Sequence, residues 1–279
     1  MFKRIVAWLR QFFSVTKKTQ LITWQAEWSV VLNEMVSFYR TLTQAEKRLF
    51  DERARLFLET TQVESGQLDV TDTDRLLVAA SAVIPVWGFP DWHYFNVSKV
   101  ILLPGAFNEQ FECGQPDSLI TGMVGAGLMS GKLVMSRPAL HLGFSNSKDK
   151  HNVGIHEFVH LVDMADGDCD GFPERLKEHA YSIAWFELVE QKINDIELRE
   201  SNVRDYGATN KAEFLAVASE YFFERPKMMA LKHPVLFQSL SKLYRQDVMR
   251  IAEDVQPRRK APCPCGSGRR YKHCCMEKT

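Results

Sequence analysis

His156-Glu157-Phe158-Val159-His160 is the stretch from which the fold of this chain can first be predicted. Residues four apart share one face of an α-helix, so the two imidazoles can bind a single metal ion. Glu157 lies beside them and can take a proton from a water molecule that the ion activates. The alternative is an ordinary amphipathic helix with two incidental histidines. The spacing favours a helix that carries a catalytic zinc ion.

The order of the remaining patterns predicts an α+β fold, mostly helical with a small sheet. Asp149 is a suitable N-cap for the metal helix, which should run to about Met164. Strands are expected at 97–103 and, as strand, turn and strand, at 121–136. A peptide could bind along the edge of this glycine-rich strand. Helices are expected at 24–40, 44–60, 74–84, 174–200, 211–224 and 233–253.

Length and composition fit either one large domain or one domain plus an appendage. The chain has 279 residues, 45% hydrophobic and 25% charged, which is ordinary for a globular protein. Lys+Arg and Asp+Glu are both 35, so no net charge draws the protein to nucleic acid or a membrane. No convincing signal peptide or membrane-spanning run is visible. A cytoplasmic location is therefore expected.

Two histidines leave a catalytic zinc site one protein ligand short. A metzincin would need glycine and histidine at positions that Asp163 and Asp166 occupy, so that extension of the motif is excluded. The remaining candidates are four glutamates, Glu174, Glu178, Glu213 and Glu220. Glu213 could instead be the third residue of a capping box begun by Asn210. Asp163, one turn beyond His160, could orient a histidine or lie in solvent.

Further residues resemble a known family. The run from Tyr206 to Phe214, read with the histidine motif, resembles the Mlc titration factor A family of zinc peptidases. Matches extend to Leu42-Thr43, Ile84-Pro85-Val86, Ile101-Leu102-Leu103-Pro104 and Ser219-Glu220-Tyr221-Phe222-Phe223, so the resemblance covers about 40–250. The spacing from Tyr206 to Glu213 also resembles the catalytic domain of anthrax lethal factor.

This resemblance implies a zincin-like peptidase that hydrolyses peptide bonds. The resemblance implies that Glu213 is the third zinc ligand and that Tyr206 assists catalysis. Without the resemblance, Tyr206 would be interpreted as a packing tyrosine. Glu220 is then a residue behind the ligands, or a helix carboxylate paired with Arg or Lys. In the implied reaction Glu157 activates a zinc-bound water and Tyr206 donates a hydrogen bond to the developing oxyanion.

The chain has six cysteines, and four of them are clustered near its end: Cys263, Cys265, Cys274 and Cys275. This spacing is typical of a metal site more than of a disulfide framework, and it indicates a reducing compartment. The segment from Cys263 to Cys275 resembles the SEC-C zinc knuckle. Four thiolates can close a structural zinc site, with His273 able to replace one of them. The alternative is a disordered tail with reactive thiols.

Three units are therefore expected: an amphipathic segment at 1–20, a metallopeptidase domain at 21–255, and a linker with the knuckle at 256–279. The predicted ligands are one catalytic and one structural zinc ion, and the predicted partner is a peptide or protein substrate. A second hypothesis is a protein that sequesters a transcriptional repressor such as Mlc. A third is a ribosome- or translocase-associated factor that docks through the basic knuckle.

Overall fold

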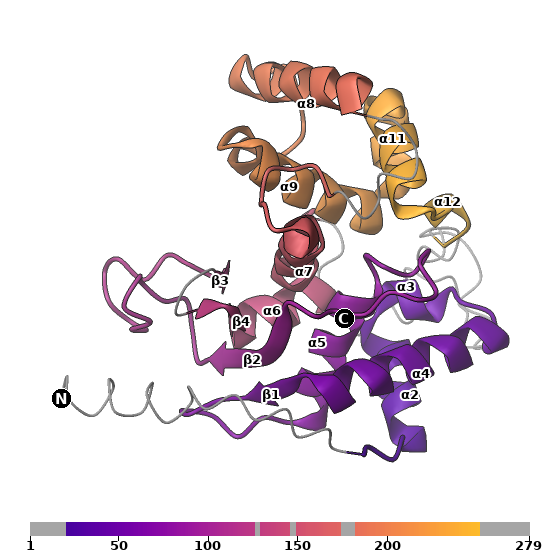
Figure 1. The fold of residues 1–279 in the computed structure, drawn as a ribbon, viewed down its shortest axis with the longest axis vertical. Helices are drawn as coiled ribbons and strands as arrows, with labels where there is room; N and C mark the ends of the chain where they lie inside the picture. The colour runs from indigo at the N-terminus through magenta and orange to yellow at the C-terminus, as the bar shows by residue number, and fades with distance from the viewer. Residues whose placement is uncertain (1–20, 126–128, 146–148, 174–181, 252–279) are drawn as a thin grey trace, which may run out of the picture.

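Helix α7 (Val153–Asp163), which contains the histidine motif and is the predicted metal helix, lies between two halves of the molecule (Figure 1). The computed structural model describes residues 21–125, 129–145, 149–173 and 182–251. One half contains the sheet and the N-terminal helices, and the other contains the C-terminal helices. The segment at 1–20, the unit at 256–279 with its cysteine cluster, and the candidate ligands Glu174 and Glu178 lie outside the described residues.

The sheet has four strands in the order β1-β2-β4-β3. Strands β1, β2 and β4 are mutually parallel, and β3 pairs antiparallel with β4 at one edge. Their bounds are β1 (Gln62–Glu64), β2 (Val97–Leu103), β3 (Gly122–Val124) and β4 (Gly131–Ser136). The predicted strand at 97–103 and the strand pair within 121–136 are confirmed. The edge strand β3 also contacts α7.

Both faces of the two central strands are covered, which explains their nearly continuous apolar sequence. Val100 and Leu102 of β2 point into the large core shared with the helices. Ile101 and Leu103 point to the opposite face, where they pack with Phe107 from the long loop between β2 and β3. The alternation follows from the two-residue period of a strand. The sheet is therefore a rigid support for the edge strand.

The N-terminal helices begin at residues that satisfy their free N–H groups. Thr43 with Glu46, and Thr71 with Asp74, each form a complete capping box. The predicted helix at 24–40 is divided at Val36, which is extended and fully buried. The bounds in this half are α2 (Ala26–Met35), α3 (Ser37–Arg40), α4 (Gln44–Thr60), α5 (Asp72–Val83) and α6 (Arg137–Ser145).

The C-terminal half is helical and packs over α7 mainly through α9. Its elements are η2 (Met164–Asp166), α8 (Ser182–Glu197), η4 (Asp205–Ala208), α9 (Lys211–Glu224), α10 (Pro226–Lys232), α11 (Pro234–Tyr244) and α12 (Val248–Ile251). The prediction for 211–224 is confirmed. The single helix predicted at 233–253 is wrong, because Arg245 adopts a left-handed conformation that ends α11.

The predicted N-cap of the metal helix is also wrong. Asn152, not Asp149, caps α7, and its Oδ1 accepts a hydrogen bond from the N–H of Ile155 at 3.1 Å. Asp149 accepts from the N–H of His151 in the preceding turn instead. Both residue types are good caps, so the sequence could not discriminate between them. The choice depends on where tertiary contacts hold the chain.

Gly154 lets α7 approach α5 closely. A methyl group at this position would lie 2.9 Å from Cβ of Ser81 and closer still to its hydroxyl oxygen. Every residue of α7 is buried, so the neighbouring helices leave little room for it to move. This contact fixes the depth at which the histidine motif lies in the core.

We expect Gly154→Ala to lower the free energy of unfolding, measured in urea, by about 1–3 kcal/mol because the core is overpacked. Removing the hydroxyl group with Ser81→Ala should recover part of that loss. A rise in stability of about 1 kcal/mol, as helix propensity alone would give, would contradict the close contact.

Candidate metal centre

His156 and His160 lie one turn apart on α7, with their Nε2 atoms 3.2 Å apart. Both side chains are nearly inaccessible to solvent, as is the whole helix. Their ring centroids are 4.8 Å apart and the rings are nearly perpendicular. Two imidazole nitrogens therefore converge on one point, as the spacing predicts.

Glu213 brings a carboxylate to the same point from the first turn of α9. Its Oε2 lies 3.0 Å from Nε2 of His156 and 3.5 Å from Nε2 of His160. Asn210 does cap α9, and it does so by accepting from the N–H of Glu213 at 2.9 Å. Glu213 thus uses its backbone N–H in the helix cap and its side-chain carboxylate in the approach to the histidines.

The donor set suits a divalent metal ion. One ligand atom from each of His156, His160 and Glu213 lies within 4.8 Å of the others. Burial disfavours charge on His156, yet Glu220 and Glu213 raise its pKa to about 10. The buried carboxylates thus stabilise positive charge at this point. Two nitrogens and one carboxylate oxygen, with room left for water, are what catalytic zinc sites use.

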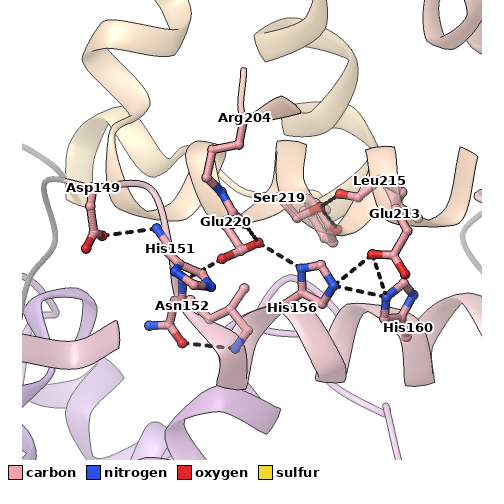
Figure 2. A network of polar contacts seen from close by, with 12 residues as sticks. Asp149, His151, Asn152, His156, His160, Arg204, Glu213, Leu215, Ser219 and Glu220 are labelled. Atoms are coloured by element: carbon pink, nitrogen blue, oxygen red, sulfur yellow. Dashed lines mark hydrogen bonds and ion pairs between the residues drawn. The ribbon is translucent and has the colours of Figure 1, made fainter. Parts of the chain in front are cut away.

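Glu220 contacts His156 on the side of the ring opposite Glu213 (Figure 2). Its Oε1 accepts from Nδ1 of His156 at 2.8 Å and also from the guanidinium group of Arg204. Its Oε2 accepts from the backbone N–H of Asn152. The carboxylate is completely buried and charge-paired. This agrees with a residue behind the ligands and not with a ligand itself, and it fixes which nitrogen of His156 faces Glu213.

His160 has a different neighbour on its far side. Its Nδ1 lies 3.7 Å from Sγ of Cys169, in the acidic turn after α7. Asp163 is buried, and its Oδ2 accepts from the N–H of Gly171 at 2.8 Å. The alternative that Asp163 lies in solvent is therefore wrong, because its carboxylate is buried and holds the turn, while an orienting role toward a histidine stays a prediction. The sequence offered no signal for Arg204 or Cys169.

The three donors open onto a cleft of about 580 Å³. The edge strand β3 lines one side, and the start of α9 lines another. Glu157 also faces this space, and burial raises the pKa of its carboxyl group. Tyr206, on η4, is half exposed, and its ring centroid lies 6.0 Å from that of His156. The cleft can therefore admit a substrate beside a proton acceptor and a phenol.

Comparison with known proteins agrees with this geometry. The family model of the glucose-regulated metallo-peptidases M90 matches residues 10–245. The chain belongs to this family. Membership supports a metallopeptidase, and a zincin-like domain of mostly helical α+β structure is confirmed. In the described part of the chain, no helix is both long enough and apolar enough to cross a membrane.

Proteins with similar sequences include several named Mlc titration factor A. The one from Serratia proteamaculans is 33% identical over 230 residues, which cover 78% of this chain and 87% of the relative. The one from Salmonella arizonae is 26% identical over 242 residues, which cover 82% and 95%. The Synechocystis protein slr2042 is 29% identical over 229 residues, which cover 78% and 82%.

The resemblance to the Mlc titration factor A family is thus confirmed. At the C-terminus, residues 259–277 match the SEC-C motif, which confirms the second resemblance. The likeness to the lethal factor catalytic domain stays a prediction. Two further assignments also stay predictions: the four cysteines to a structural zinc ion, and His156, His160 and Glu213 to a catalytic one.

We expect Glu220→Gln to weaken zinc binding at the buried site by about 10–100-fold, because a neutral amide orients His156 less firmly than a carboxylate. The affinity is measured by competition with a chromophoric chelator. Glu224→Gln, one turn further along α9, is the matched control and should leave zinc affinity unchanged. Equal affinity in both variants would contradict the orienting role of Glu220.

Proposed function

We propose that the protein is a zinc-dependent peptidase whose catalytic ion is held by His156, His160 and Glu213. The observation that carries this proposal is the convergence of their donor atoms in a cleft that Glu157 also lines. Zinc, when bound, would polarise a peptide carbonyl group and make a water molecule more acidic. The family match supports peptide hydrolysis as the reaction.

Glu157 is the proposed proton carrier. Its buried carboxyl group has a raised pKa, which suits a group that must accept and then release a proton. In this proposal Glu157 takes a proton from the attacking water and passes it to the leaving amine. Tyr206 donates a hydrogen bond to the oxyanion that develops on the substrate carbonyl group. Its position beside His156 at the mouth of the cleft supports this role.

The edge strand is the proposed support for the substrate backbone. β3 has one partner, β4, on one side, while its residues line the cleft on the other. An extended peptide can add to such an edge through backbone hydrogen bonds. The substrate is therefore a peptide or an exposed segment of a protein in extended form.

The cysteine cluster is proposed to hold a second, structural zinc ion. The match of residues 259–277 to the SEC-C motif supports this. Four thiolates close a tetrahedral site and leave no position for a reacting water. The basic residues around the knuckle suit a docking role. This charge is the only support for a ribosome- or translocase-associated partner.

Regulator binding is the second proposal, and the catalytic geometry makes it the weaker one. Its support is the name Mlc titration factor A carried by the similar proteins. A transcriptional regulator could bind without being cleaved. Turnover and regulator binding are separable, because only turnover depends on the Glu157 carboxylate.

We expect Glu157→Gln to abolish turnover of a peptide library while zinc stays bound, because the amide cannot accept the proton. The loss should be at least about 10²–10⁴-fold in kcat. Full activity in this variant would sink the proposed mechanism.

We expect zinc analysis of the full chain to give two ions, one lost in His160→Ala and the other lost when Cys263 and Cys265 are both changed to Ser. The two sites use separate ligands, so each loss should be independent of the other. One ion, lost only with the cysteines, would leave the histidine site without zinc and favour regulator binding.

A further inference from the structure

Gly122, in the edge strand β3, lies directly against the side chain of Glu157. A methyl group at Gly122 would lie 2.7 Å from both Cγ and Cδ of Glu157, and closer still to its Oε1. The three nearest atoms all belong to that one side chain. The outer half of Glu157, including its carboxylate, therefore rests on the bare backbone of the strand.

Backbone conformation does not explain this glycine. Among the described residues, the glycines with positive φ are Gly114, Gly131, Gly167 and Gly171, and Gly122 is not one of them. Gly122 pairs with Met135 in the regular ladder between β3 and β4. A glycine within a strand weakens it, and often marks a site where another group approaches the backbone closely. Here that group is the carboxylate of Glu157.

The space at Gly122 matters because Glu157, apart from the side that faces the cleft, is packed within the protein. The residue is only 5% exposed. Helix α7 is buried along its whole length, so it cannot move away from the strand as a unit. Contact with the strand thus sets how close to β3 the carboxylate can lie beside the histidines. An added methyl group would push it by roughly 1 Å, and an error of that size at a reacting group can cost about 10²-fold in rate.

We propose that Gly122 is a positioning residue that sets the place of the Glu157 carboxylate relative to the metal centre. This inference rests on the proposed function, in which Glu157 carries the proton. The edge strand β3 then has two roles. Its backbone can bind a substrate, and at Gly122 it also contacts the carboxylate that α7 presents. With Glu157 in its observed conformation, a methyl group does not fit between the strand and the carboxylate.

The first test compares kcat and KM for Gly122→Ala, with Gly105→Ala as the control. A methyl group at Gly105 would meet no atom within 4 Å, so that variant should behave as the unchanged protein. We expect Gly122→Ala to keep its zinc and its KM and to lose about 100-fold in kcat, because the proton acceptor is displaced. Unchanged kcat, or a loss that lies wholly in KM, would overturn the inference.

The second test uses stability and needs neither metal nor substrate. In the metal-free protein, Gly122→Ala should lower the Tm by several degrees. In the Glu157→Ala background the same substitution should cause no loss, because the atoms that it would meet are gone. Equal losses in both backgrounds, or failure to fold in both, would show that Gly122 is needed for another reason and would overturn the proposal.

Failure of the proposed function and failure of the positioning role would give different results. Full activity of Glu157→Gln would remove the proposed function, while the stability cycle could still show the contact between Gly122 and Glu157. An inactive Glu157→Gln together with a fully active Gly122→Ala would remove only the positioning role.

Discussion

The buried carboxylate of Glu220 is the constraint around which the centre of this molecule is arranged. A charge with no exposure to water is tolerated only when its oxygens are hydrogen-bonded and its charge is paired. Glu220 meets both conditions through His156, the backbone of Asn152 and Arg204. These partners come from the metal helix, from its N-cap and from the residue that precedes η4. The Glu220 carboxylate thus orients His156, holds the start of α7, and binds Arg204 next to the segment that contains Tyr206.

The cleft follows from how the two halves of the molecule meet at α7. The sheet supplies the edge strand on one side, and α9 supplies Glu213 on the other. The ligand-bearing face of α7 is therefore enclosed by elements that are themselves packed into the core. Polar groups held in this way are already oriented before a substrate arrives. That preorganisation suits electrostatic stabilisation of charge that develops during a reaction.

Several features of this chain are local, and the sequence alone determined them. The spacing of His156 and His160 places them on one helical face whatever surrounds the helix. The apolar runs of β2 and β4 predict buried strands, and the capping boxes at Thr43 and Thr71 begin helices through contacts three residues apart. The α+β class follows from the order of these local patterns. Residue spacing and chemistry were enough because neighbours in sequence make the deciding contacts.

Only the tertiary structure decided which distant residues complete the site. Glu213 and His156 are 57 positions apart, and the sequence left Glu213 as a cap or a ligand until family resemblance favoured the ligand. Arg204 and Cys169 gave no signal, and the sequence predicted Asp149 as the cap where the structure has Asn152. The space beside Gly122 is likewise invisible in sequence, because it depends on where a separate helix packs. Contacts of this kind are set by the burial of whole elements against one another, which no local pattern encodes.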